Sequence, residues 1–278
     1  MIRGTTRLAA VIGWPVEHSA SPALLNAAFA ATNIDAVLVP MGVPPDGLDA
    51  TFAGLRAIRA LGASVTVPHK LAAVAACDEL TPAAQAIAAV NCVHVDGRRL
   101  VGHNTDAGGF ADALAEAGVA PARAVLLGAG GAARAVAYGL AESGAEVEVV
   151  ARRIPDGSWI DSPQISISRW DRLRHALARA DLVVDCTPVG LGIDGDVEAA
   201  FVDALPLDAL QPGATVATLV YHRRTRLLER ASSAGYPTLD GACMLVHQGA
   251  RAFTIWTGVP APIDVMTRAL AALRTVDE

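Results

Sequence analysis

Two short polar segments within the first 106 residues carry the residue types that acid–base chemistry needs. Residues 64–70 read Ser-Val-Thr-Val-Pro-His-Lys, which places the hydroxyls of Ser64 and Thr66 on one face of an expected strand. Lys70 follows just beyond a bend that the proline forces. Open α/β sheets bind ligands at the carboxyl ends of their strands, so Lys70 is a candidate acid–base group. A solvated surface lysine is the simpler alternative.

The second segment, residues 102–106, reads Gly-His-Asn-Thr-Asp and follows an expected hairpin. It ends in the carboxylate of Asp106, and Asn91 begins an expected strand shortly before it. Turn formation explains part of this composition, because Asn and Asp turn readily. His69 and His103 stand beside these groups, and lone histidines near a polar turn are more often structural than catalytic. Their role stays open.

A pair of hydroxyls precedes the first expected helix, in the run His-Ser-Ala-Ser-Pro of residues 18–22. Ser21 is expected as the N-cap and Pro22 as the first helical residue. Capping does not explain Ser19, and two hydroxyls beside a helix N-terminus also suit a substrate carboxylate. The motif by itself therefore allows both a structural and a binding role.

A glycine loop, Gly128-x-Gly130-x-x-Ala133, lies between an apolar strand and an amphipathic helix. This is the context of the dinucleotide fingerprint, in which glycines allow a tight turn and free N–H groups at the helix start attract pyrophosphate. An ordinary strand-to-helix turn is the alternative.

The end of the next expected strand indicates which nicotinamide cofactor binds. An acid there would bind the ribose 2′-hydroxyl of NAD, whereas arginine accommodates the 2′-phosphate of NADP. The chain carries Arg152 and Arg153, two guanidiniums capable of bidentate phosphate binding. NADP is therefore favoured over NAD. In the alternative, both arginines are merely solvated and Asp156 takes the ribose.

An α/β scaffold must position these groups, because short apolar runs of β character alternate with Ala-rich helical stretches. Such βαβ units build parallel sheets. The first series has expected strands at 8–13, 36–40, 64–67, 90–95 and 100–102, and helices at 22–31, 48–60 and 71–76. The second has strands at 124–127, 146–151, 182–186, 215–220 and 237–239, and helices at 132–143, 170–180 and 225–234. Two tail helices, 242–256 and 263–273, have no strand of their own and must pack on another element.

Composition narrows the partner to a small molecule. The net charge of −6 comes from interspersed acids and bases, so nothing indicates a nucleic-acid surface. Every apolar stretch is interrupted before the roughly 18 residues that a membrane helix requires. The cysteines at 77, 92, 186 and 243 lack metal-ligand spacing and fit a reducing cytoplasm. No metal is expected, and the sequence leaves a monomer or a homodimer open.

Taken together and in this order, the segments resemble the shikimate dehydrogenase family over nearly the whole chain. The family patterns are Gly-x-Pro-x-x-x-Ser-x-Ser-Pro, Val-Thr-Val-Pro-x-Lys, Ala-Val-Asn, Asn-Thr-Asp-x-x-Gly, the glycine loop, a tyrosine and a C-terminal helical motif. They match residues 13–22, 65–70, 89–91, 104–109, 128–133, Tyr221 and 241–248.

The resemblance implies the fold and the domain boundaries. Residues 1–106 plus 241–278 would form an N-terminal α/β domain, completed by the C-terminal helices, that binds substrate and carries catalysis. Residues 107–240 would form an NADP-binding domain with a Rossmann-type, doubly wound parallel sheet.

It also implies the roles of the site residues. The reaction would be reversible reduction of 3-dehydroshikimate to shikimate by NADPH, with Lys70 and Asp106 in proton transfer and substrate positioning. A cationic lysine stabilises the alkoxide that forms from a carbonyl, and a carboxylate orients the hydroxyl. The substrate-binding set implied is Ser19, Ser21, Ser64, Thr66, Asn91, Tyr221 and Gln248. The cofactor-binding set is Gly128, Ala129, Gly130, Gly131, Ala132, Arg152, Arg153, Thr187, Gly241 and Met244.

Several departures from the family pattern bear on the substrate. Ser64 stands where the family usually has Asn, which would shorten the reach to a ring hydroxyl, and His103 replaces a frequent acid. Thr218 occupies a position often held by Asp, and Ala151-Arg152-Arg153 replaces Asn-Arg-Thr. A mismatched polar partner can cost a site several orders of magnitude in preference. Quinate, an aminated shikimate or another cyclic hydroxy acid therefore remains an alternative, as does a non-catalytic ligand-binding regulator.

Overall fold

The computed structural model describes residues 2–154, 161–192 and 195–274. The chain folds into two compact units, which are described separately below. Unit 1 contains Met1–Gly109 and Leu245–Glu278, and unit 2 contains Phe110–Met244. The chain passes between them within two helices, α5 (Asp106–Glu116) and α10 (Ala242–Thr257).

The sheet of unit 1 brings several strand ends to one edge. Its order is β2-β1-β3-β5-β6-β4, where β1 pairs in parallel with β2 and β3, and β5 runs antiparallel to β3 and β6. Because β5 is reversed, its start lies at the edge where β1, β3 and β6 end. The strands are β1 (Arg7–Gly13), β2 (Ala36–Gly42), β3 (Gly62–Val65), β4 (Glu79–Leu80), β5 (Cys92–Asp96) and β6 (Arg99–His103).

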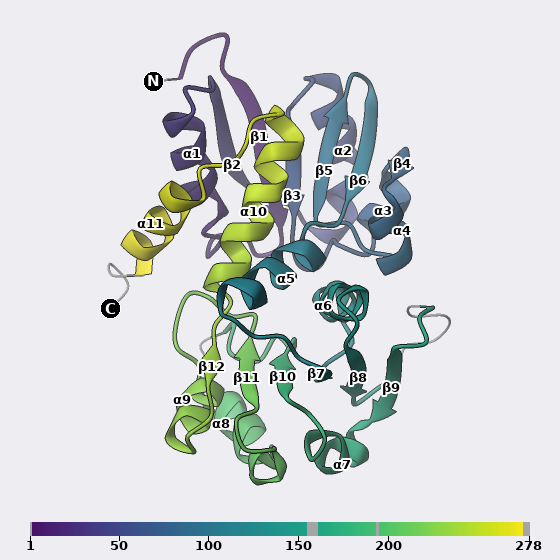
Figure 1. Ribbon diagram of the computed structural model, residues 1–278. Coiled ribbons are helices and arrows are strands. Elements are labelled where there is room, and N and C mark those ends of the chain that lie inside the picture. The colour runs from purple at the N-terminus through teal and green to yellow at the C-terminus, as the bar shows by residue number, and fades with distance from the viewer. Residues whose placement is uncertain (1, 155–160, 193–194, 275–278) are drawn as a thin grey trace. The chain divides into compact units, whose positions relative to one another are not determined.

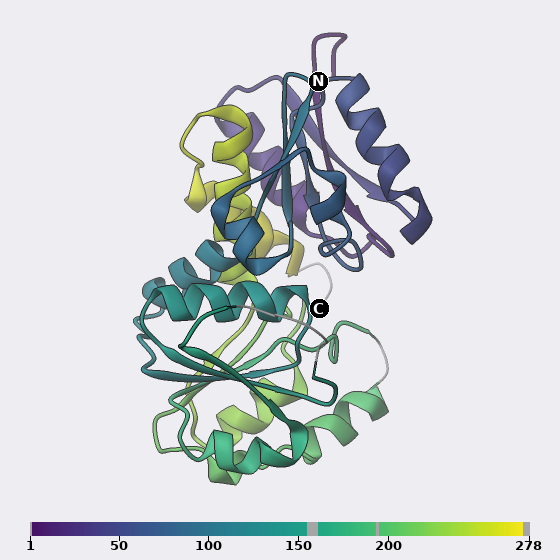
Figure 2. The ribbon, with the colours of Figure 1, turned by 90° about the vertical axis from the view of Figure 1, so that its right-hand side faces the viewer.

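Helices cover both faces of this sheet, as Figures 1 and 2 show. On one side lies α10, whose Phe253 contacts Phe29 of α1 with ring centroids 5.4 Å apart. The indole N–H of Trp256, also on α10, donates to the carbonyl oxygen of Val93 at 3.0 Å. The tail helices thus complete unit 1, as expected. Its other helices are α1 (Ser21–Ala31), α2 (Leu48–Ala57), α3 (Ala73–Ala76), α4 (Pro82–Ile87) and α11 (Ile263–Arg274).

The sheet of unit 2 is wholly parallel, in the order β12-β11-β10-β7-β8-β9. This is a doubly wound sheet of the nucleotide-binding type, and the direction of winding reverses between β7 and β10. The expected fold class is therefore confirmed. The strands are β7 (Arg123–Leu127), β8 (Glu146–Ala151), β9 (Ile165–Arg169), β10 (Leu182–Asp185), β11 (Thr215–Thr218) and β12 (Thr238–Leu239).

Each face of this second sheet has its own apolar core. Val136 and Leu140 of α6 pack with Val149 on one face. Leu177 and Leu227 pack with Val183 on the other. The helices are α6 (Gly131–Glu142), α7 (Leu173–Leu177), α8 (Gly195–Asp203) and α9 (Arg226–Ser233). Among the described residues, no helix combines the length and the apolar character that crossing a bilayer would take.

Some elements differ from the sequence-based expectation. In the expected turn at residues 102–106, Gly102 and His103 belong to β6 and Asp106 begins α5. This helix was not expected, because it contains the glycines at 108 and 109 and glycine is a poor helix former. The strand β9 and the short elements β4 and α4 were also not anticipated. Helix α2 ends at Ala57 rather than Ala60, since Arg59 takes a positive φ of 53°.

Gly62 offers a test of packing in unit 1. A Cβ added there would lie 2.1 Å from the Val93 carbonyl oxygen and 2.4 Å from Trp256 Nε1. We expect Gly62→Ala to lower the free energy of unfolding by about 1–3 kcal/mol, the usual cost of overpacking. Gly54, exposed on α2 with nothing within 4 Å of an added Cβ, supplies the control. Gly54→Ala should gain about 0.5–1 kcal/mol. Equal urea-unfolding midpoints for the two variants would contradict this packing.

Candidate active site

An ion pair between Lys70 and Asp106 forms the centre of the candidate site in unit 1. Lys70 Nζ lies 2.7 Å from Asp106 Oδ2. The two side chains are only 16% and 6% exposed, so water screens the pair poorly. The structure therefore brings together the two residues that the sequence proposed for proton transfer.

Asn91 holds the carboxylate from the other side. Its Nδ2 donates to Asp106 Oδ1 at 2.8 Å and to Thr105 Oγ1 at 2.9 Å. Its Oδ1 accepts from the Thr105 backbone N–H at 2.6 Å. Asn91 precedes β5, and Thr105 follows β6, so the reversal of β5 is what lets this amide reach the carboxylate. Each oxygen of Asp106 thus has a different donor.

Gln248 reaches the same cluster from α10, and its Oε1 lies 3.4 Å from Asn91 Nδ2. Gly109 makes this approach possible, because a Cβ added there would lie 2.6 Å from the Gln248 backbone nitrogen. The spacing of Asn-Thr-Asp-x-x-Gly therefore has a packing reason. One turn of α5 after Asp106, the chain needs a residue without a side chain.

The segment that carries Lys70 is fixed on both sides. The Val90 backbone N–H donates to the Lys70 carbonyl oxygen at 2.8 Å. His69 is 2% exposed, and its Nε2 hydrogen-bonds to the Val43 carbonyl oxygen at 2.7 Å. Since a carbonyl can only accept, Nε2 carries the proton and donates. His69 therefore anchors the segment after β3 to the segment after β2.

The expected capping role of Ser21 is wrong. Helix α1 begins at Ser21 itself, its N-cap residue is Ala20, and no side chain caps it among the described residues. Instead, the Ser21 backbone N–H donates to Ser19 Oγ at 3.4 Å. Ser19 therefore shapes the turn, and the Ser21 hydroxyl, on a residue 7% exposed, is left for another role.

The remaining expected substrate-binding residues on β3 and its continuation are Ser64 and Thr66. Ser64 is 7% exposed within the strand, and Thr66 follows its end. Thr66 is held by its backbone N–H, which donates to the Ile12 carbonyl oxygen at 2.8 Å. An added Cβ at Gly13 would lie 2.6 Å from Thr66 Cγ2, so β1 and this segment approach closely.

Thr105 belongs to the cluster through Asn91, and Asn104 lies next to it; the sequence placed both in the polar segment at 102–106 without assigning either a role. Asn104 Oδ1 accepts from the Ala107 backbone N–H at 3.3 Å, as an N-cap of α5 does. The spacing from Asn104 to an expected helix would have revealed this role, had the helix been predicted. His103 has a buried Nε2 for which the described residues supply no hydrogen-bond partner. Burial lowers its pKa and so disfavours the protonated ring.

Unit 2 has the geometry of a dinucleotide site at the reversal point between β7 and β10. Gly128 follows β7 with a φ of +96°, which favours glycine, and an added Cβ would lie 3.2 Å from Thr187 Cγ2. Gly130 is the N-cap of α6, and in the described chain no side chain caps this helix. Its first turn has no acid. An anion is therefore favoured at this helix start.

Arg152 and Arg153 directly follow β8, and both are exposed. They are placed where the fold presents the ribose of a bound dinucleotide. Asp156, the acid of the alternative interpretation, lies outside the described residues.

The other cofactor candidates have distinct surroundings. Ala129, Gly131 and Ala132 lie around the glycine turn, where Ala129 and Ala132 are half-buried. Gly241 must be glycine for packing, because an added Cβ would lie 2.2 Å from the Leu219 carbonyl oxygen. Met244 is 8% exposed and packs in the core of unit 2. Tyr221, a substrate candidate, also lies in unit 2, half-buried, with its ring edge-on to His222 at 5.9 Å.

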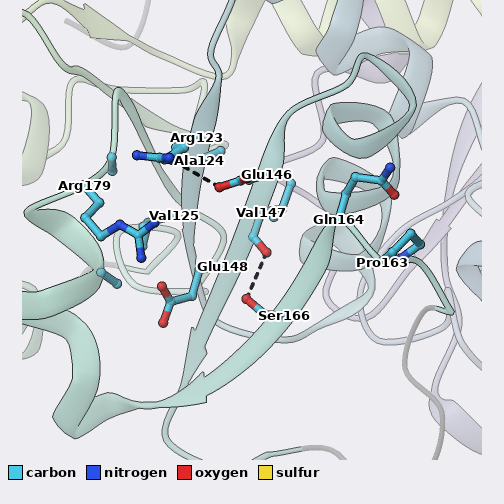
Figure 3. Close-up of a pocket in the computed structure, with 12 residues that line it drawn as sticks. Arg123, Ala124, Val125, Glu146, Val147, Glu148, Pro163, Gln164, Ser166 and Arg179 are labelled. Atoms are coloured by element: carbon cyan, nitrogen blue, oxygen red, sulfur yellow. Dashed lines mark hydrogen bonds and ion pairs between the residues drawn. The ribbon is translucent and has the colours of Figure 1, made fainter.

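A separate hollow of about 220 Å³ lies in unit 2 beside β7, β8 and β9 (Figure 3). Arg123 and Glu146 form an ion pair at 3.0 Å among its lining residues. Both side chains are more than half exposed, and none of the residues of the proposed sites lines it. We therefore place no part of the candidate site there.

Comparison with known proteins identifies the family to which the chain is similar. The shikimate dehydrogenase substrate binding domain matches residues 11–93, and the shikimate 5′-dehydrogenase C-terminal domain matches residues 241–271. A shikimate dehydrogenase (NADP(+)) from Symbiobacterium thermophilum is 42% identical, over 98% of this chain and 96% of the relative.

Two solved structures extend the comparison. Shikimate 5-dehydrogenase from Thermus thermophilus, in complex with NADP(H) and shikimate, superimposes with a TM-score of 0.82 at 34% identity. The match covers 96% of this chain and 100% of that one. The ligand-free 5-ketofructose reductase of Gluconobacter sp. strain CHM43 gives 0.80 at 29% identity, covering 98% and 100%. With a relative of 42% identity over nearly its full length, the chain belongs to the shikimate dehydrogenase family.

Proposed function

We propose that this protein is an NADP-dependent shikimate dehydrogenase, which interconverts 3-dehydroshikimate and shikimate. The observation that carries the proposal is the poorly hydrated Lys70–Asp106 pair at the edge where the strands of unit 1 converge. A ligand-binding regulator would need groups for a carboxylate and a nucleotide, but it would not need this pair. The resemblance in sequence to NADP-dependent shikimate dehydrogenases supports the same conclusion.

The cofactor site fits NADP. In this proposal the turn at Gly128–Ala132 and the start of α6 hold the pyrophosphate. Arg152 and Arg153 bind the 2′-phosphate, and Thr187, Gly241 and Met244 complete the site. Bound NADP(H) would accept or supply the hydride at the substrate carbon.

In this proposal, residues of unit 1 bind the substrate and transfer the proton. Ser19 and Ser21 hold the carboxylate, while Ser64, Thr66, Asn91 and Gln248 bind the ring hydroxyls. Tyr221 is a further substrate-binding residue in this proposal. In the reducing direction, the Lys70 ammonium stabilises the negative charge that develops on the carbonyl oxygen and donates its proton there. Asp106, fixed by Asn91, orients the lysine and the reacting hydroxyl.

The proposed domain boundaries separate substrate binding and catalysis from NADP binding. Residues 1–106 plus 241–278 bind substrate and carry catalysis, and residues 107–240 bind NADP. We further propose action in the cytoplasm as a monomer or a homodimer. The four cysteines at 77, 92, 186 and 243 are free, which supports a reducing compartment.

A related ring substrate is the second candidate, because Ser64 offers a shorter side chain than the family's usual asparagine. The 5-ketofructose reductase shows that this architecture serves other substrates as well. Quinate and an aminated shikimate are the alternatives that keep the same chemistry.

A matrix of two substrates and two cofactors tests the proposed function. The purified protein should reduce NADP⁺ when given shikimate, with a higher kcat/KM than for quinate or for NAD⁺. Arg152→Ala should raise KM for NADP⁺ about 10- to 100-fold, the equivalent of one lost hydrogen bond to a charged group, and leave KM for NAD⁺ nearly unchanged. Arg98→Ala, which alters an exposed arginine in the turn between β5 and β6 of unit 1, is the control for surface charge. A higher kcat/KM with NAD⁺ would overturn the cofactor assignment.

Substitution of Lys70, the only lysine in the 278-residue sequence, tests the proposed mechanism. Lys70→Ala should lower kcat by about 10²- to 10⁴-fold, the range of general acid–base catalysis, and change KM for shikimate much less. Lys70→Arg keeps the positive charge but cannot give up a proton near neutral pH. Its kcat should also fall at least about 10²-fold. Near-normal turnover by Lys70→Arg would show that charge alone suffices.

A further inference from the structure

A buried carboxyl group stands at the reversal point of the unit 2 sheet, and the function proposed so far does not use it. Asp185 is the last residue of β10 and is 4% exposed. Its neighbours in register are Leu127 of β7 and Thr218 of β11. Burial raises the pKa of Asp185 to about 6. A buried acid is costly to keep, so its contacts call for a functional explanation.

The contacts of Asp185 lead to the glycine turn. Asp185 Oδ1 accepts from the Thr187 backbone N–H at 2.9 Å, and the Thr187 side chain also interacts with the carboxyl group. Thr187 Oγ1 in turn accepts from the Val189 backbone N–H at 3.2 Å. Thr187 Cγ2 lies 3.2 Å from where a Cβ on Gly128 would be. Asp185 therefore fixes the segment that faces the glycine turn.

We propose that Asp185 is a positioning residue for the cofactor, which holds Thr187 against the Gly128 turn and so sets the crevice that receives the dinucleotide. This inference rests on the proposed NADP-dependent function. Asp185 acts through Thr187 and the backbone after β10.

The charge state of Asp185 matters because a carboxylate is a stronger acceptor than a neutral carboxyl group. When Asp185 is protonated, one of its oxygens becomes a donor and holds Thr187 less well. Glu198 of α8 and the thiol of Cys186 are the titratable groups that interact with it in the described chain. Glu198 is itself neutralised by Arg223, whose Nη2 lies 2.6 Å from Glu198 Oε2. Cofactor affinity should therefore fall as the pH drops through about 6.

Folding stability should respond in the opposite sense. The folded protein binds the Asp185 proton more tightly than the unfolded chain, whose usual pKa is 3.8. Ionisation of Asp185 therefore lowers the stability of the folded state as the pH rises from 3.8 through about 6. Asp185→Asn should raise the melting temperature at pH 7.5 and leave it nearly unchanged at pH 4. An acid that reduces stability but improves cofactor binding has a functional role rather than a structural one.

The test measures the Kd of NADP⁺ by isothermal titration calorimetry on the full-length protein. At pH 7.5, Asp185→Ala, which removes the acceptor, should raise Kd about 10-fold or more, roughly one charge-assisted hydrogen bond. Asp185→Asn keeps one oxygen acceptor, as the protonated acid does, but loses the charge, so its Kd should rise by an intermediate factor of about 3- to 5-fold. The Kd of shikimate without cofactor should be unchanged in both. Asp181→Asn is the matched control, because Asp181 also accepts backbone N–H groups but lies at the opposite end of β10.

The pH profile provides a second, independent readout. The 2′-phosphate of NADP⁺ titrates near the same pH as Asp185. The effect of Asp185 is therefore read from the difference between the Kd profiles of wild type and Asp185→Asn. From pH 8 to pH 5.5, Kd should rise more steeply in wild type than in Asp185→Asn. Parallel profiles, or wild-type affinity in Asp185→Ala, would overturn the inference and leave the proposed function standing. If wild type did not bind NADP⁺ at all, the proposed function would fail as well.

Discussion

The ion pair between Lys70 and Asp106 is the interaction on which the rest of unit 1 depends. Two charges with side chains 16% and 6% exposed lose much of their hydration, and only well-placed hydrogen bonds offset that loss. Asn91 supplies them, and it can do so because β5 runs against its neighbours. The sheet, the hairpin and the start of α5 are thus arranged around one carboxylate. The composition of the chain also favours a proton-transfer role for Lys70. Apart from histidine, every other basic residue is an arginine. The ammonium group of a lysine releases a proton far more readily than a guanidinium does.

In unit 2, residues 128–133 of the glycine turn carry no cationic side chain that could bind a phosphate. Backbone N–H groups at the start of α6 attract the phosphate instead, and glycine at 128 and 130 leaves them accessible. Positive charge is supplied after β8 by Arg152 and Arg153. The carboxylate of Asp185 holds the backbone after β10 at the proposed cofactor site. Its ionisation lowers the stability of the folded state. In the proposed site, backbone N–H groups hold the pyrophosphate and arginine side chains hold the 2′-phosphate.

The α/β fold class could be predicted from the sequence, and so could the placing of Lys70 and Asp106 in one site. Lys70, Asp106 and the glycine turn could be found because their chemistry requires particular residue types beside a strand end. Asn91 and Gln248 were also expected in the site, but their contacts could not be predicted. The bond from Asn91 to Asp106 depends on a reversed strand, and the contact of Gln248 with Asn91 depends on a helix from the far end of the chain. Helix α5 was missed because its two glycines are disfavoured by local propensity, although Gly109 is required by packing against Gln248. Likewise, Ser21 looked like an N-cap, whereas the tertiary turn gave the backbone contact to Ser19.

In the proposed mechanism the Lys70 amino group contacts the substrate directly. Because the chain has one lysine, protein labelled with ε-carbon-13 lysine should give a single lysine resonance, which needs no assignment. Titration with shikimate, without cofactor, should shift this resonance to saturation, and the midpoint should equal the Kd from calorimetry. A resonance that stays in place while calorimetry shows shikimate bound would mean that Lys70 does not contact the substrate.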